Sequence, residues 1–323
     1  MKAIEATNYG SSEVLEVVDR KEPQPGTNQV KIDVKAVGIN FADIMQRRGL
    51  YPGGPDPPYV PGLEAAGEIE EVGENVDRQE GERVVALVNR GGYAEKVVAD
   101  ARSLFDIPES MSFEEGAGFP LQYLTAHNIL HEWGELKAGE TVLIHAAAGG
   151  VGTAAVQLAR IADAKIIGTA STEEKLELAS DLGAHHTVNY TEVDFAEEVN
   201  RVTDGEGVDM VLDGVGGDVF ESSLDCLAHF GRIMVYGVAS GQVATPDTTR
   251  LLFENKSVIG FHLGTAMRHD AKKVLSSVPE LSRLLESRDL EVIVGKVFDL
   301  DEAAEAHEYI ENRRSMGKVV LKP

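Results

Sequence analysis

The sequence feature that most constrains the fold is the glycine-rich run AAAGGVG at residues 146–152. An apolar run with the character of a β-strand, residues 141–145, precedes it, and residues 153–159 have a helical pattern. A strand that enters a helix through a tight glycine turn presents bare backbone N–H groups, and the helix N-terminus adds partial positive charge. The run therefore predicts binding of a dinucleotide pyrophosphate, and a nicotinamide cofactor implies hydride chemistry.

Strand and helix patterns alternate from about residue 122 onwards. This alternation is typical of βαβ units in a doubly wound parallel sheet. The expected strands are residues 141–145, 165–170, 186–190, 208–213, 232–237 and 257–261. We therefore predict an α/β fold in which residues 122–264 form a dinucleotide-binding Rossmann domain.

The two flanking segments have a different character. Residues 1–121 carry short strand-like runs and a loop at 51–59 that is too rich in proline and glycine for a helix, so we predict a mostly antiparallel β domain. Residues 265–323 do not extend the nucleotide-binding fold. Their expected elements are helices at 271–288 and 301–313 and strands at 291–297 and 318–321. We expect residues 265–323 to rejoin residues 1–121 in a catalytic domain that the Rossmann domain interrupts.

Composition is typical of a globular protein with two domains. The 323 residues are 43% hydrophobic and 26% charged. No apolar run approaches the roughly 20 residues of a membrane span, and residues 1–6 lack a signal-peptide pattern. We therefore expect a cytoplasmic protein with no membrane partner. The single cysteine, Cys226, excludes an intrachain disulfide and a cysteine-rich zinc site, and we expect it to be a small core residue.

The net charge is strongly acidic. The 54 Asp and Glu residues against 30 Lys and Arg residues give −24, and the acidic residues are scattered along the chain. A diffuse acidic surface is a salt-tolerance device of the kind halophiles use. One hypothesis is therefore a host with a salty cytoplasm, and the alternative is an ordinary acidic cytosolic protein. Either way, the charge argues against binding to nucleic acid, which needs clustered basic residues.

The end of the second Rossmann strand predicts which nicotinamide cofactor binds. NAD-dependent enzymes place an acidic residue there, about 20 residues beyond the glycine turn, to bind the ribose 2′-hydroxyl. This chain has GTAS at residues 168–171, and Lys175 follows one helical turn later. Hydroxyl groups and an ammonium suit a 2′-phosphate, so we predict NADPH. The alternative is that Lys175 is a solvated helix lysine balanced by its glutamate neighbours.

Several motifs in the same order make the chain similar to a known family. It resembles the zinc-independent quinone oxidoreductase (zeta-crystallin-like) branch of the medium-chain dehydrogenase/reductase superfamily. The matching stretches are residues 37–43, 60–67, 146–152, 168–171, 211–217 and 316–321. This resemblance implies that the β domain is GroES-like and that the whole chain follows the family's architecture.

The chain departs from the zinc alcohol dehydrogenases of that superfamily at two positions. Those enzymes have a cysteine ligand where Asn40 stands and a His-Glu pair where this chain has Leu63 and Glu64. Neither Asn nor Leu supplies the ligand that zinc prefers. His127 and His131 are four residues apart on an expected helix, but no third ligand is apparent, so we predict no metal site.

The chemistry that fits these residues is hydride donation to an acceptor that needs little acid catalysis. Quinones and α,β-unsaturated carbonyl compounds both qualify. By resemblance, Asn40, Asp43 and Tyr51 would line the substrate and nicotinamide pocket, with Asn40 and Tyr51 as hydrogen-bond partners of a substrate carbonyl. The alternatives are that Asn40 is a turn residue, Asp43 a residue at a helix start and Tyr51 a loop-packing residue. Positioning of the cofactor and the acceptor, rather than a strong base, would account for the reaction rate.

The expected cofactor contacts lie in the glycine turn, at the carboxyl ends of the strands and near the C-terminus. They are Thr125, Ala148, Gly149, Gly150, Val151, Gly152, Thr169, Ser171, Lys175, Tyr190, Gly237, Val238, Phe261, His262 and Lys318. Arg313 could also reach the cofactor, although a solvated charge at a helix end is the alternative.

The leading hypothesis is an NADPH-dependent quinone reductase. The alternatives are an alkenal or enone reductase of the same fold and an NADPH-binding protein without turnover. An RNA-binding role is opposed by the −24 charge. Residues 256–263 contain the expected edge strand of the Rossmann sheet, and the resemblance implies that two copies pair there in a homodimer.

Overall fold

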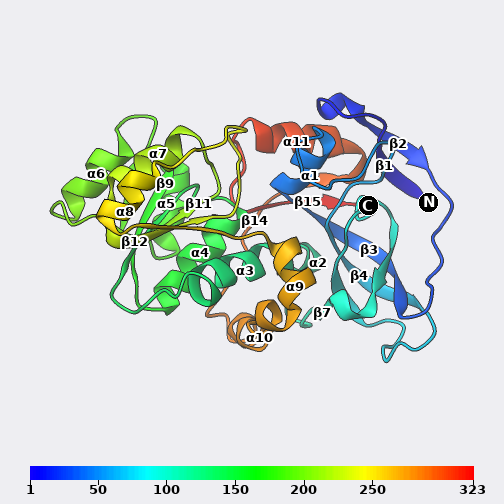
Figure 1. Cartoon of the computed structure of the whole chain (residues 1–323). Coiled ribbons are helices and arrows are strands. Elements are labelled where there is room, and N and C mark those ends of the chain that lie inside the picture. Colours follow the sequence, from blue (N-terminus) through cyan, green and yellow to red (C-terminus); the bar gives the residue numbers. More distant parts are fainter. The chain divides into compact units, whose positions relative to one another are not determined.

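The computed structural model describes residues 1–323, and residue contacts divide them into two units. Unit 1 contains Met1–Leu121 and Val292–Pro323, and unit 2 contains Gln122–Glu291 (Figure 1). Unit 1 is built on a mostly antiparallel sheet and unit 2 on a parallel sheet, which confirms the predicted fold class. No helix has both the length and the apolar character needed to span a bilayer.

Unit 2 contains a six-stranded parallel sheet. Its strands in spatial order are β10 (His186–Asn189), β9 (Lys165–Ala170), β8 (Thr141–Ile144), β11 (Val208–Asp213), β12 (Leu227–Val235) and β13 (Ser257–Gly260). Numbered along the chain, this order is 3-2-1-4-5-6, the doubly wound arrangement. All six predicted strands are present, but β12 begins earlier than expected, at Leu227.

Helices lie before, between and after the strands of unit 2 along the chain. They are α3 (Pro120–His127, whose first two residues belong to unit 1), the π-helix η3 (Asn128–Glu132), α4 (Gly150–Ile161), α5 (Glu173–Asp181), α6 (Phe195–Val202), α7 (Asp218–Asp225), α8 (Thr248–Glu254), α9 (Leu263–Leu275) and α10 (Val278–Glu286). In α6, Asp194 caps the first turn by accepting hydrogen bonds from two backbone N–H groups. Phe195 and Val199 of α6 pack in the same core as Leu143 of β8 and Val211 of β11.

The segment that rejoins unit 1 begins at Val292, whereas the sequence predicts residue 265. Residues between these points belong to unit 2 because several contacts hold them there. The Asn128 side chain donates to the Val274 carbonyl at 3.3 Å, and Gln157 exchanges two hydrogen bonds with the Glu291 backbone at 2.9 and 3.0 Å. The single helix predicted at 271–288 is also wrong, because α9 ends at Leu275 and α10 begins at Val278.

Unit 1 is built on a seven-stranded sheet. Its strands in spatial order are β14 (Val294–Asp299), β15 (Lys318–Lys322), β3 (Gln29–Ile39), β4 (Glu64–Val72), β5 (Arg83–Leu87) and β7 (Leu104–Asp106), and β6 (Lys96–Asp100) also pairs with β3. Only the β14–β15 pair is parallel. A separate antiparallel pair is formed by β1 (Lys2–Ala6) and β2 (Leu15–Asp19).

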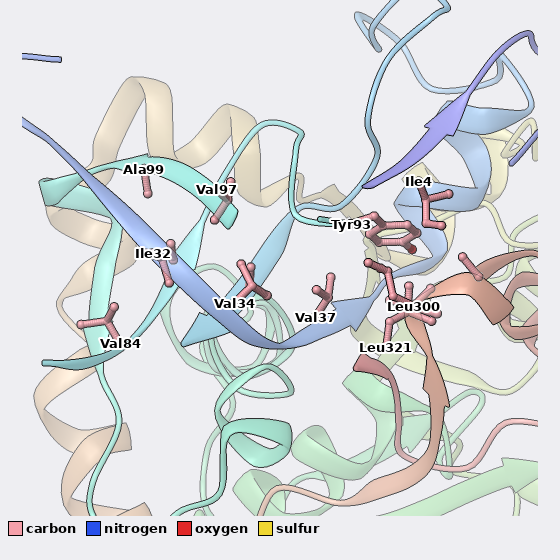
Figure 2. Packing of buried hydrophobic residues seen from close by; sticks show 14 of the residues in the cluster. Ile4, Ile32, Val34, Val37, Val84, Tyr93, Val97, Ala99, Leu300 and Leu321 are labelled. Carbon is pink, nitrogen blue, oxygen red and sulfur yellow. The ribbon is translucent and has the colours of Figure 1, made fainter. Parts of the chain in front are cut away.

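Buried residues of these strands form much of the unit 1 core. Figure 2 shows Ile32, Val34 and Val37 of β3 among its buried side chains, together with Leu321 of β15 and with Tyr93, which precedes β6. The helices of unit 1 are η1 (Ser12–Val14), α1 (Phe41–Arg47), η2 (Ala101–Ser103), α2 (Phe113–Gly116), η4 (Leu300–Glu302) and α11 (Ala303–Glu311).

The pairing of β15 with β3 brings together two distant parts of the sequence. Val319 is paired with Ile39 in an antiparallel register. Lys318 directly precedes Val319, and Asn40 directly follows Ile39. These two residues therefore lie at the same end of the strand pair. This register creates the polar cluster of unit 1 that is described below.

Candidate functional site

The glycine turn of unit 2 has the backbone arrangement that a phosphate group needs. Helix α4 begins at Gly150 after Gly149, and no side chain caps it. The first N–H groups of an α-helix have no partner inside the helix, so here they are open to an anion. A Cβ atom at Gly150 would lie 1.8 Å from Gln122 Nε2, and one at Gly152 would lie 2.2 Å from the Ala146 carbonyl oxygen. The turn therefore fits a dinucleotide pyrophosphate.

The other predicted cofactor contacts of unit 2 follow the carboxyl ends of its parallel strands. Tyr190 follows β10, Gly237 and Val238 follow β12, and Phe261 and His262 follow β13. Hydrogen bonds between backbones tie this edge together: the Tyr190 N–H donates to Ala170 at 3.2 Å, and the Phe261 N–H to Val235 at 2.8 Å. Such an edge is where doubly wound sheets bind ligands.

Not every residue at this edge faces outwards. Thr169 is only 1% exposed, and its hydroxyl hydrogen-bonds His145 Nδ1 at 3.0 Å. His145 Nε2 in turn hydrogen-bonds the Ser223 hydroxyl at 2.9 Å, and burial lowers the pKa of His145 to about 3. A neutral buried histidine therefore hydrogen-bonds the Thr169 hydroxyl, and the expected contact of Thr169 with the cofactor stays a prediction. Ser171 and Lys175 are half-buried.

Three further predicted residues of unit 2 have clear structural places. Thr125 is buried in α3, and Ala148 is buried in the glycine turn. His262 precedes α9 and caps it, because its Nδ1 accepts from the Thr265 N–H at 3.2 Å. The only tryptophan, Trp133, packs against Phe261 with ring centroids 5.1 Å apart.

The histidine pair of unit 2 does lie together. The rings of His127 and His131 are 4.7 Å apart, and Glu280 is 3.6 Å from His127 Nε2. Burial lowers the pKa of both, that of His131 to about 4. No group of three or more His, Cys, Asp or Glu side chains is placed to hold a metal ion.

Unit 1 contains a buried polar cluster where β3 ends and β4 and β15 begin, next to α1. The Lys318 ammonium donates to Asn40 Oδ1 at 2.8 Å and forms an ion pair with Glu64. Asn40 Nδ2 donates to Glu64 Oε1 at 2.9 Å, and the Asn40 backbone N–H donates to Asp43 Oδ2 at 2.8 Å. We call Asn40, Asp43, Glu64 and Lys318 the Asn40 cluster.

Burial decides what the members of the Asn40 cluster can do. Lys318, Glu64 and Asp43 are 0% exposed, and Asn40 is 6% exposed. The Lys318 ammonium is enclosed by Asn40 and Glu64, and the expected contact of Lys318 with the cofactor stays a prediction. Burial raises the pKa of Asp43 from 3.8 to about 7, although the Asn40 N–H and the Lys318 charge oppose the rise.

A second buried network lies beneath α1 and was not anticipated from the sequence. Arg47 is fully buried, and its guanidinium contacts His307 Nδ1 at 3.3 Å and Glu311 at 2.6 Å. Tyr93 hydrogen-bonds His307 Nε2 at 2.8 Å, and burial lowers the pKa of His307 to about 3. These contacts anchor α1, which carries Asp43, to α11.

The remaining predicted residues of the site lie in loops of unit 1. Tyr51 is half-buried in the loop between α1 and β4, where its carbonyl accepts from the Gly54 N–H at 3.0 Å. Arg313 follows α11 and is exposed.

Two family models match the chain. The alcohol dehydrogenase GroES-like domain matches residues 26–109, and the zinc-binding dehydrogenase matches residues 150–280. The first match lies within unit 1 and the second within unit 2.

Individual proteins match over nearly the full length. A quinone oxidoreductase of Pseudomonas aeruginosa is 38% identical and covers 100% of this chain and 99% of its own. A 2-haloacrylate reductase of a Burkholderia species is 41% identical, and the match covers 94% of this chain and 93% of that protein. The structure of Escherichia coli quinone oxidoreductase complexed with NADPH has a TM-score of 0.94 at 35% identity, with 100% of both chains covered. These relatives give no support to the hypothesis of a salt-rich host.

Proposed function

Because the chain belongs to the quinone oxidoreductase branch of the medium-chain dehydrogenase/reductase superfamily, we propose that it reduces quinones with NADPH and without a metal. The observation that carries this proposal is the uncapped glycine start of α4 beside a second strand that ends without an acidic residue. An Escherichia coli relative crystallised with NADPH supports the choice of cofactor. Asn40 and Leu63, at the positions where zinc dehydrogenases carry ligands, support the absence of a metal.

NADPH supplies the hydride when it is bound. The α4 N-terminus holds the pyrophosphate through backbone N–H groups, and the Lys175 ammonium with the Ser171 hydroxyl holds the 2′-phosphate. Asn40, with Tyr51 as a second donor, hydrogen-bonds the carbonyl oxygen of the acceptor. Negative charge builds on that oxygen as the acceptor is reduced, so a fixed donor lowers the barrier without acting as an acid.

A second candidate function is reduction of an activated C=C bond. It is supported by the identity of 41% to a 2-haloacrylate reductase. The same groups serve both reactions, because hydride addition to a quinone or to the β-carbon of an enone places negative charge on a carbonyl oxygen.

An acceptor panel separates these functions. NADPH loss is followed at the nicotinamide absorbance band with 1,4-naphthoquinone, phenanthrenequinone, a 2-alkenal and a 2-haloacrylate. Faster turnover of the quinones supports the first proposal, and faster turnover of the alkenal or haloacrylate supports the second. NADPH binding without turnover of any acceptor, detected by quenching of Trp133 fluorescence, overturns both in favour of a binding protein.

We also propose that two copies pair through unit 2. β13 is an edge strand of the parallel sheet, and an open strand edge invites pairing. Large apolar side chains are exposed in the same unit, among them Phe230, Val243, Leu252 and Phe253, which are 77%, 85%, 70% and 77% exposed.

A further inference from the structure

The Asn40 cluster fixes the orientation of a single carboxamide. Its oxygen faces the Lys318 ammonium at 2.8 Å, and its nitrogen faces a carboxylate oxygen of Glu64 at 2.9 Å. A flipped amide would place two donors against each other and two acceptors against each other. The ion pair between Lys318 and Glu64 therefore permits only one orientation of Asn40.

The backbone around the cluster is shaped to admit this ion pair. A Cβ atom at Gly38 would lie 2.5 Å from Lys318 Cε, 2.8 Å from Glu64 Oε1 and 2.0 Å from the Ala117 carbonyl oxygen. Only glycine fits there without displacing the pair. The Leu121 N–H donates to Glu64 Oε2 at 3.1 Å, so both carboxylate oxygens are held.

One hydrogen of the Asn40 amide is held only weakly. Nδ2 carries two hydrogens, and the second points to the Gly38 carbonyl at 3.3 Å, which is longer than an ordinary hydrogen bond. Asn40 keeps 6% exposure whereas Lys318 and Glu64 have none. Of these three side chains, only Asn40 can offer a hydrogen to a ligand.

We infer that Lys318 is a positioning residue that orients and polarises Asn40, so that the second Nδ2 hydrogen is donated to the acceptor's carbonyl oxygen as that oxygen becomes negative. The inference rests on the proposed function, in which Asn40 meets the acceptor. An ammonium bound to the amide oxygen withdraws electron density from the nitrogen and strengthens its N–H as a donor. Lys318 thereby stabilises the developing anion through Asn40.

The reaction balances without a proton from Lys318. The acceptor gains a hydride, the electron pair of its double bond moves onto the carbonyl oxygen, and NADPH leaves as NADP⁺. The resulting hydroquinone anion or enolate then takes one proton from solvent. Lys318 transfers no proton and contributes only its charge.

The test removes the two buried charges together. Lys318→Met/Glu64→Gln deletes both without leaving either charge unpaired, which would endanger folding. We expect kcat to fall about tenfold, the difference between a charge-assisted and a neutral hydrogen bond, with an unchanged Kd for NADPH. The matched control is Lys322→Met/Glu114→Gln, because it removes a Lys–Glu pair, 2.9 Å apart, that is not fully buried and whose lysine lies on the same strand as Lys318. It should leave kcat unchanged.

A double-mutant cycle tests that the effect passes through Asn40. Asn40→Ala should lower kcat about a hundredfold, as loss of an oxyanion donor does elsewhere. In the Asn40→Ala background, Lys318→Met/Glu64→Gln should cause no further loss. Independent, additive losses overturn the inference.

Two readouts separate this role from a merely structural one. Across a series of substituted quinones, kcat of the Lys318→Met/Glu64→Gln variant should depend more steeply than kcat of wild type on how strongly the substituents withdraw electrons. In the cofactor-free protein, the NMR resonance of the Asn40 side-chain NH₂ should move upfield in that variant and stay in place in the control. An unchanged slope or an unmoved resonance refutes polarisation.

The remaining outcomes are also decisive. If wild-type protein reduces no carbonyl acceptor, the proposed function fails, and this role of Lys318 fails with it. If wild type is active and the cycle is additive, only the inference fails. Should Lys318→Met/Glu64→Gln not fold, Lys318→Gln/Glu64→Gln keeps amide groups that can hydrogen-bond one another and is judged by the same criteria.

Discussion

The buried carboxyl of Asp43 makes a sharp prediction about stability and pH. Burial raises its pKa from 3.8 to about 7, although the Asn40 N–H and the Lys318 charge oppose the rise. The folded state therefore binds the Asp43 proton more tightly than the unfolded state does. The contribution of this proton to the free energy of unfolding is complete below pH 3.8 and is lost as the pH rises through about 7. At about 1.4 kcal/mol per pKa unit, the loss is about 4 kcal/mol.

The substitution that isolates this effect is Asp43→Asn, which mimics the protonated acid at every pH. Relative to wild type, the variant should gain about 4 kcal/mol of unfolding free energy between pH 4 and pH 8. Urea unfolding followed by circular dichroism at each pH measures the difference, and carboxylates common to both proteins cancel. Asp19→Asn, at an exposed site on β2, controls for loss of a carboxylate as such. A difference that stays constant over this range would refute the reasoning.

Three further predictions concern unit 2. Lys175→Ala should raise the Kd for NADPH about tenfold or more by loss of a charge-assisted contact, and it should leave the Kd for NADH unchanged. Quenching of Trp133 fluorescence measures both Kd values, and Lys165→Ala at the start of β9 is the control. An equal loss of affinity for NADPH and NADH would contradict the assignment of Lys175 to the 2′-phosphate. Gly150→Ala should destabilise the protein by about 1–3 kcal/mol, because its Cβ would lie 1.8 Å from buried Gln122 Nε2, and thermal unfolding that matches wild type would contradict this. Phe253→Asp should give a monomeric mass in light scattering if two copies pair beside β13, and a persisting dimer mass would show that they do not.

The parallel sheet was predictable because each of its strands is a short apolar run between turns. β9 and β11 match their predicted limits, and the glycine turn lies where the strand–turn–helix pattern placed it. Such patterns depend on residues that are close in sequence, which is why they can be read without a structure.

Contacts between distant residues were not predictable in this way. Lys318 and Asn40 are 278 residues apart, and only the register of β15 against β3 joins them. His145 directly follows β8 and Thr169 lies on the neighbouring β9, and nothing local indicates that the histidine engages the hydroxyl. The break between α9 and α10 did carry a local signal, since Pro279 suits the first turn of a new helix.

The discontinuity of unit 1 has a consequence for how the chain is synthesised. Unit 2 is one continuous segment, so it can fold as soon as it emerges from the ribosome, whereas β14 and β15 are made after it. Until β15 arrives, Glu64 has no ammonium to pair with, and closing the sheet around it would bury a lone carboxylate. Unit 1 therefore completes its fold late in translation, and a nascent chain stalled before Val292 exposes β3 without its partner β15.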